Sequence, residues 1–130
     1  MSYMVIGASV FILISLALAW LATAVRIMQV PALKAYFPSS ENIVKSHIDY
    51  LLMALLLIAF YLLGKQMGVV YPSWAIWAML IGGFVNPYAF LILARHEPED
   101  FKPGPTFSIG STASFVLTTL GFGVAAVMVL

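Results

Sequence analysis

Residues 42–63 of this 130-residue chain read NIVKSHIDYLLMALLLIAFYLL and form its most informative segment. The run is apolar and long enough to cross a bilayer, for which about 20 helical residues suffice. Its first two turns nevertheless carry Lys45, His47 and Asp49. Ionisable side chains are costly at membrane depth, so those found there mark candidate functional sites. His47 is the first candidate, because an imidazole can carry a proton or bind a metal near neutral pH.

The composition of the chain excludes a water-soluble domain. Hydrophobic residues make up 63% of the chain and charged residues 8%, whereas soluble domains are about 45–50% apolar and roughly a quarter charged. A net charge of +1 gives no basis for binding nucleic acid. The chain has no cysteine, which excludes disulfides, thiolate ligands and cysteine nucleophiles. Any metal must therefore be held by histidine, carboxylate, tyrosine or amide groups, and the chain has only two histidines.

Four apolar segments predict an all-α integral membrane protein, an antiparallel four-helix bundle with a single domain over residues 1–130. Pro31 and Pro38 are expected to interrupt helix in the connection formed by residues 26–41. Ser39 or Ser40 is then expected to cap the second transmembrane helix. We expect Gly64 to end that helix. The predicted spans are residues 5–25, 43–63, 73–94 and 106–130.

Basic residues are distributed unevenly between the two sides of the predicted bundle. Lys65 and the amino terminus lie on one side, and the other carries Arg26, Lys34, Lys45, Arg95 and Lys102. Because basic loops stay in the cytoplasm, we expect both termini on the non-cytoplasmic side. We expect the membrane to be a bacterial inner membrane.

The second span has an expected functional face. Helical spacing groups His47 with Tyr50, Ala54 and Tyr61, together with Leu51 and Ile58. A cofactor slot on this helix alone would expose Tyr50, Ala54 and Tyr61 to lipid unless another subunit covers them. The alternative interpretation is that His47 sits at the membrane interface and only bonds a neighbouring helix.

Three other polar groups near the first two spans have structural interpretations. Asp49 points about 160° away from His47 on a helix, and we expect it to form an ion pair with Lys45. Ser9 and Ser15 are expected to bond back to carbonyls of their own helix.

The third span carries a second polar cluster, GGFVNPYAF, at residues 82–90. The Asn86 amide lies in mid-membrane and needs a hydrogen-bond partner there. Pro87 cannot donate a hydrogen bond, which frees the carbonyl of Gly83. The cluster suits either a kinked helix held by an asparagine bond or a slot that a flat cofactor enters between helices. By contrast, His96 lies in the loop among Glu97, Glu99 and Asp100, and we expect a solvated loop rather than a metal site.

These motifs resemble a family of small four-helix membrane isomerases, styrene oxide isomerase and hydroxylaminobenzene mutase. In the second helix the resemblance lies in Lys45-Ser46-His47, and in the third it lies in Gly83-Phe84-Val85-Asn86 followed by Tyr88 and Phe90. It continues through Pro103, Gly104, Pro105, Phe107 and Ser108. The chain differs from the styrene oxide isomerase pattern in having Met53 in place of an asparagine and Phe90 in place of a tyrosine.

The resemblance implies a homotrimer with haem b at the subunit interfaces and His47 as the axial ligand of the iron. Ferric iron would act as a Lewis acid in the redox-neutral isomerisation of a small apolar aromatic epoxide to an aldehyde. The candidate catalytic residues are Tyr50, Asn86 and Tyr88. The candidate cofactor-binding residues are His47, Gly83, Asn86 and Phe90.

Two other functions remain compatible with the sequence. A non-enzymatic haem protein could carry electrons or bind a gas, and a bis-histidine site in it would need His96 to approach His47. A structural or assembly subunit would hold no cofactor. The visible absorption spectrum separates the three, because an open iron face gives five-coordinate iron, two histidines give six-coordinate iron, and the structural subunit is colourless.

Overall fold

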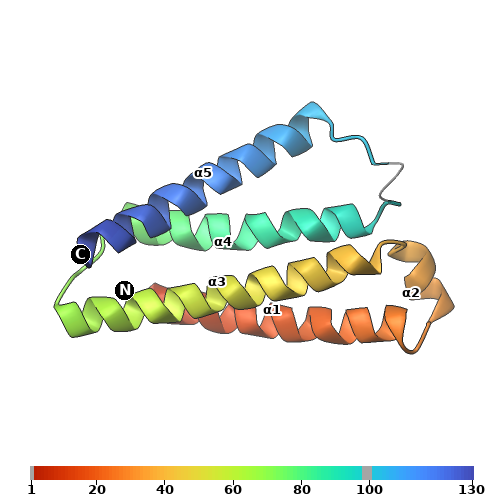
Figure 1. Cartoon of the computed structure of the whole chain (residues 1–130), viewed down its shortest axis with the longest axis horizontal. Helices are drawn as coiled ribbons and strands as arrows, with labels where there is room; N and C mark the ends of the chain where they lie inside the picture. The colour runs from red at the N-terminus through yellow and green to blue at the C-terminus, as the bar shows by residue number, and fades with distance from the viewer. Residues whose placement is uncertain (1, 98–100) are drawn as a thin grey trace.

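The computed structural model describes residues 2–97 and 101–130, and it confirms the all-α prediction for them. This part of the chain forms five helices, α1 (Ser2–Arg26), α2 (Pro31–Tyr36), α3 (Ser40–Met67), α4 (Ser73–Ala94) and α5 (Pro105–Met128). All but α2 are long and apolar enough to cross a membrane. The four long helices pack as an antiparallel bundle (Figure 1). The chain is therefore an integral membrane protein with four spans.

The second transmembrane helix is longer than the predicted span at both ends. Ser39 is its N-cap residue, although the Ser39 Oγ accepts a hydrogen bond from the Asn42 side chain at 2.7 Å rather than from a backbone N–H. The prediction that Gly64 ends the helix is wrong, because one interior glycine costs a helix only about 1 kcal/mol. The helix ends instead where Gly68 adopts a φ of +68°, a left-handed conformation that glycine adopts without strain.

The connection between the first two spans contains a helix that the sequence did not predict. The helix α2 begins at Pro31, whose fixed φ suits the first helical position. None of its residues is buried. It lies at the end of the bundle opposite to both termini (Figure 1). There the Arg95 Nε atom, just after α4, donates to the Tyr36 carbonyl at 3.2 Å.

Helix packing divides the chain into two pairs. Helix α1 packs mainly on α3, α5 packs mainly on α4, and contacts between α3 and α4 join the pairs. The α4–α5 contact is close because a Cβ atom at Gly121 would lie 2.7 Å from the Met79 backbone nitrogen. A Cβ at Gly82 would likewise lie 2.7 Å from the Thr118 backbone nitrogen. Glycine thus lets these two helices meet backbone to backbone.

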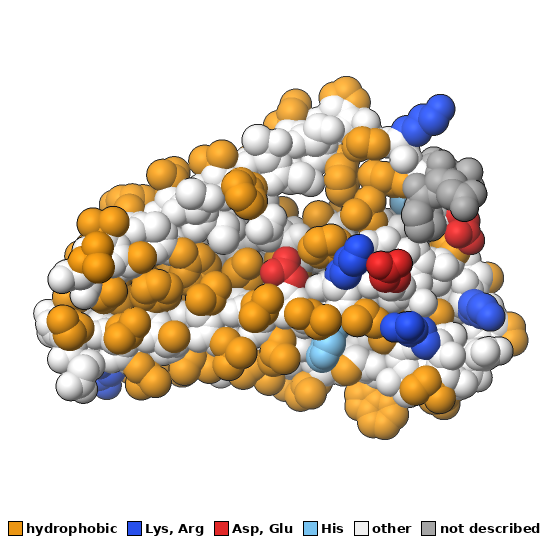
Figure 2. Space-filling view, viewed as in Figure 1, with side chains coloured by type: hydrophobic (Ala, Val, Ile, Leu, Met, Phe, Trp, Pro, Cys, Tyr) orange, Lys and Arg blue, Asp and Glu red, His pale blue; other side chains and the backbone are white. Residues whose placement is uncertain are grey.

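The surface of the bundle is mostly hydrophobic along its length, whereas Lys and Arg side chains gather mainly at the end that carries α2 (Figure 2). Large apolar side chains such as Leu13, Trp20 and Ile109 are more than half exposed, at 66%, 72% and 69%. Such a surface is unfavourable in water and is what lipid-facing helices require.

Candidate functional site

His47 lies where α3 packs on α1, and Ser15 of α1 holds its ring. The Nδ1 atom of His47 lies 2.7 Å from the main-chain oxygen of Ser15 and 2.9 Å from its Oγ. The Ser15 hydroxyl donates to the main-chain oxygen of His47 at 3.1 Å. Ser15 is buried and His47 is partly exposed. One edge of the imidazole is therefore fixed inside the protein.

These contacts determine which ring nitrogen carries the proton when His47 is neutral. A carbonyl oxygen can only accept a hydrogen bond, so the 2.7 Å contact with Ser15 requires an N–H at Nδ1. The Nε2 atom on the other edge then keeps its lone pair. An Nδ1–H bond to a main-chain carbonyl is the arrangement that commonly orients metal-binding histidines. The Nε2 atom of His47 is thus free to accept a hydrogen bond or to bind a metal.

Ser9 and Ser15 of α1 behave differently from each other. Ser9 donates to the Val5 carbonyl of its own helix at 3.0 Å, as predicted. The same prediction is wrong for Ser15, which bonds His47 instead. The difference follows from position, because Ser9 is exposed and Ser15 is buried against α3, where a polar group on the neighbouring helix is within reach.

A groove between α1 and α3 lies one turn of α3 from His47, on the side toward α2, and His47 does not line it. It has a volume of about 430 Å³ and is lined by Ala22, Thr23, Arg26, Ile27 and Val44. Val44 lies one turn before His47 on α3. Ala22 and Arg26 follow Ser15 by nearly whole numbers of helical turns, so all three share one side of α1. A ligand in the groove would therefore meet the Arg26 side chain, and His47 lies one turn of α3 beyond the Val44 wall.

Tyr50 is one turn beyond His47 on α3 but bonds a different helix. Its hydroxyl donates to the Phe84 carbonyl of α4 at 2.9 Å, and Ser46 donates to the Pro87 carbonyl at 2.8 Å. Tyr50 and Ala54 are 1% and 0% exposed, so the prediction that a single chain leaves them open to lipid is wrong. The buried face of α3 is rotated relative to the predicted one, and only Tyr61 of the three is partly exposed.

The candidate residues of α4 lie in different surroundings. A Cβ atom at Gly83 would lie 3.0 Å from the Phe11 ring and 3.6 Å from the Met53 Cβ, so side chains of the same chain already approach this glycine. Asn86 and Phe90 are partly buried, and no hydrogen bond to the Asn86 side chain is found within residues 2–97 and 101–130.

Tyr88 is 44% exposed, and its ring stacks on Phe84 with centroids 6.0 Å apart. It also lines a groove between α4 and the first half of α5, with a volume of about 350 Å³. The two helices diverge there (Figure 1). The other walls of this groove include Val85, Ala89, Thr106, Phe107 and Ser111.

The predicted ligand and the predicted wall residues make no direct contact with each other among the described residues. Among the described residues, no hydrogen bond or ring contact joins His47 to Tyr50, Asn86, Tyr88 or Phe90. His47 bonds α1, whereas Tyr50 bonds α4. His47 and Tyr50 are thus bonded to different neighbouring helices.

Asp49 is partly buried on α3, and its predicted ion pair with Lys45 is wrong. The Lys45 Nζ atom lies instead 3.5 Å from the Glu41 Oε1 atom, and both side chains are exposed. A glutamate four residues before a lysine is the favourable order on a helix. The pair with Glu41 also keeps the Lys45 charge at the exposed start of α3, whereas a pair with Asp49 would place it closer to the middle of the bundle. Asp49 has no ion-pair partner among the described residues.

His96 lies just after α4 and is exposed. Its ring contacts Phe101, with centroids 5.2 Å apart. Among the described residues there is no group of three or more His or carboxylate side chains that could hold a metal ion. Glu99 and Asp100, which the sequence places beside His96, lie outside the described residues.

No known protein family, curated protein or solved structure matches the chain. Sequence reasoning found His47 but missed Ser15 and Arg26, the residues that orient the ring and end the groove. A buried hydroxyl in an otherwise apolar span was the available signal for Ser15, because such a group must find a partner.

Proposed function

We propose that this protein is a membrane haem b protein in which the Nε2 atom of His47 is the axial ligand of the iron. The observation that supports this most strongly is the 2.7 Å contact between the His47 Nδ1 atom and the Ser15 carbonyl. It fixes the ring and leaves a single nitrogen donor with a free lone pair. Metal-binding histidines are commonly oriented through such bonds.

The donor set of the chain fits haem with one protein ligand. Histidine is an axial ligand of haem iron, and no cysteine is present to replace it. The groove beside His47 is apolar except for Thr23 and Arg26. Arg26 would pair with a propionate, since a guanidinium matches a carboxylate in a bidentate geometry. The groove is open on the lipid side, so we propose that a second copy closes it, in a homotrimer.

The proposed activity is the redox-neutral isomerisation of a small apolar aromatic epoxide to an aldehyde. When bound, ferric haem supplies a Lewis acid that polarises the epoxide oxygen. The chain's own residues hold the ligand, exclude water and orient the substrate. Tyr88, Asn86 and Phe90 of a neighbouring copy are the proposed wall opposite His47. The Tyr50 hydroxyl is already bonded to Phe84, so its proposed role is to keep α4 in place.

We further propose that the protein lies in a bacterial inner membrane with both termini on the non-cytoplasmic side. The termini share one end of the bundle (Figure 1), and most Lys and Arg side chains gather at the other (Figure 2). Basic loops are retained in the cytoplasm. The groove that ends at Arg26 would then open toward the cytoplasmic leaflet.

The test is the visible spectrum of detergent-purified, haem-loaded protein and of two histidine variants. We expect five-coordinate high-spin iron in the wild type, loss of bound haem in His47→Ala and an unchanged spectrum in His96→Ala. Loss of haem in both variants would favour a bis-histidine electron carrier. An unchanged Soret band in His47→Ala would refute the proposal, and a wild type that stays colourless would favour a structural subunit.

A further inference from the structure

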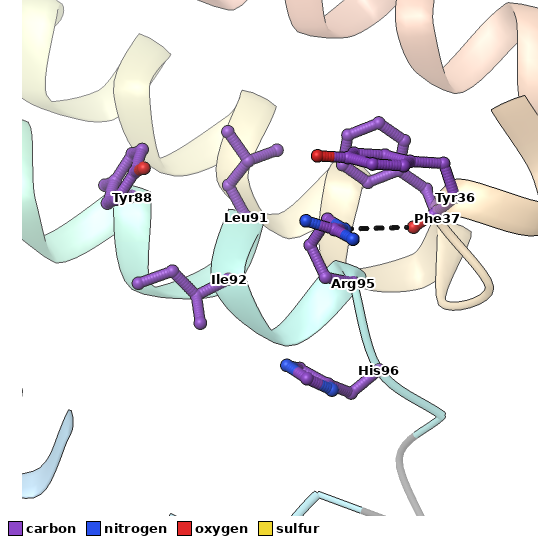
Figure 3. Close-up of a pocket in the computed structure, with 7 residues that line it drawn as sticks. All are labelled: Tyr36, Phe37, Tyr88, Leu91, Ile92, Arg95 and His96. Carbon is purple, nitrogen blue, oxygen red and sulfur yellow. Dashed lines mark hydrogen bonds between the residues drawn. The ribbon is translucent and has the colours of Figure 1, made fainter.

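A cavity of about 340 Å³, open to the surface, lies where the carboxyl end of α4 borders α2. Its walls include Tyr36, Phe37, Leu91, Ile92, Arg95 and His96 (Figure 3). We propose that this cavity binds an anionic amphiphile, with a phosphate group on Arg95 and an apolar tail against Leu91 and Ile92.

The Arg95 guanidinium is held in place before any anion arrives. Its Cζ atom lies 3.5 Å from the centroid of the Tyr36 ring, and its Nε atom donates to the Tyr36 carbonyl at 3.2 Å. Both terminal nitrogens remain as donors at the cavity, and a planar fork of this kind matches two phosphate oxygens. No ion pair among the described residues involves Arg95.

The rest of the cavity suits a tail rather than a second polar group. Leu91 and Tyr88 project on the same side of α4 as Arg95, and Ile92 projects on the other (Figure 3). These side chains extend back from Arg95 along α4, into the span. His96 lies at the edge beyond Ile92 (Figure 3). The cavity thus has a charged group at the membrane surface and apolar walls toward the membrane interior. This arrangement matches that of a lipid, whose headgroup lies at the surface and whose tails lie in the interior.

The charge of this end of the bundle favours an anion. Arg26, Lys34 and Lys102 are exposed at the same end, and Lys45 is paired with Glu41. Glu97 is also exposed near His96, but it does not line the cavity. Juxtamembrane basic groups attract anionic lipids in general. Arg95 differs from them because it is oriented by Tyr36 and borders a cavity.

The test uses the full chain in nanodiscs of phosphatidylcholine that contain phosphatidylglycerol, with retained phosphatidylglycerol measured by mass spectrometry after purification. Arg95→Gln should retain about tenfold less phosphatidylglycerol, the effect expected for one lost charge-assisted contact. Ile92→Trp keeps Arg95 but fills the cavity and should lower retention similarly. Lys34→Gln is the matched control, because it removes one basic charge outside the cavity, and should lower retention much less than Arg95→Gln does. Circular dichroism checks that each variant is folded.

Inorganic phosphate is the second probe and identifies the source of the anion. Phosphatidylglycerol retention that added phosphate does not disturb assigns the cavity to lipid. Displacement by phosphate in the wild type assigns it to a soluble phosphate compound and still supports the Arg95 site. Equal retention in Arg95→Gln and wild type would overturn the proposal, and so would an equal loss in Lys34→Gln. Neither result depends on whether the protein binds haem.

Discussion

The contact between α4 and α5 gives the sharpest test of the fold. Replacing Gly121 with alanine would place a Cβ atom 2.7 Å from the Met79 backbone nitrogen and 3.0 Å from the Ala75 carbonyl oxygen. Ordinary contact begins at 3.4 Å, so the helices would have to separate by about 0.7 Å, the difference between 3.4 and 2.7 Å. Because both contacts are to backbone atoms, no side chain can rotate out of the way.

The free-energy change combines two effects of opposite sign. Overpacking costs about 1–3 kcal/mol, whereas replacing a helical glycine with alanine gains roughly 0.5–1 kcal/mol. We therefore expect Gly121→Ala to lower the free energy of unfolding by about 1–2 kcal/mol. Gly123 is the matched control, since a Cβ there meets nothing within 4 Å. Gly123→Ala should be neutral or stabilising.

The assay is unfolding of the detergent-solubilised chain by increasing dodecyl sulfate, followed by circular dichroism. The comparison of the two alanine variants cancels the helix-propensity gain, so their difference measures the packing cost alone. Wild-type stability in Gly121→Ala, or an equal loss in Gly123→Ala, would show that α5 does not pack on α4 as described.

Three further predictions concern the polar contacts and the topology. Tyr50→Phe removes the bond to the Phe84 carbonyl and should cost about 0.6 kcal/mol, the average for such bonds in membranes; an unchanged unfolding curve would contradict that bond. Ser15→Ala keeps the carbonyl contact with the imidazole but removes the hydroxyl, and should weaken haem binding about tenfold by titration; undiminished affinity would argue against Ser15 as an orienting residue. A reporter active only in the cytoplasm should give signal when fused at Lys102 and none at Leu130, and the reverse pattern would invert the proposed orientation.

The four spans were predictable because each is a long apolar run, and length and hydropathy alone identify such helices. The short helix α2 was not, because six residues carry too little periodicity to distinguish a turn of helix from a loop. Gly64 misled the boundary prediction for a related reason. Glycine often ends a helix, but here the helix continues through Gly64 to Met67 because packing along α3 outweighs the local preference of glycine.

Of the candidate site, only His47 could be predicted from the sequence. His47 stood out because an imidazole is rare in a span, whatever surrounds it. Its partner Ser15 lies 32 positions away, and the pairing depends on how far α1 is shifted along α3, which no local pattern encodes. Helical spacing also predicted that Tyr50 lies within about 60° of His47 around the axis of α3. Helical spacing does not show which side of α3 faces α4, so the sequence analysis placed Tyr50 at the lipid surface although it is buried.

The hydrogen bond from His47 to the Ser15 carbonyl forms only when α1 and α3 are aligned in one register along their lengths. A shift of α1 along α3 by a single residue, about 1.5 Å, would move the carbonyl out of line with Nδ1. Any group that binds Nε2 favours the tautomer with hydrogen on Nδ1, and therefore favours the one register in which that hydrogen has an acceptor. The coupling is reciprocal. Ligand occupancy at His47 and alignment of the first two spans would then rise and fall together.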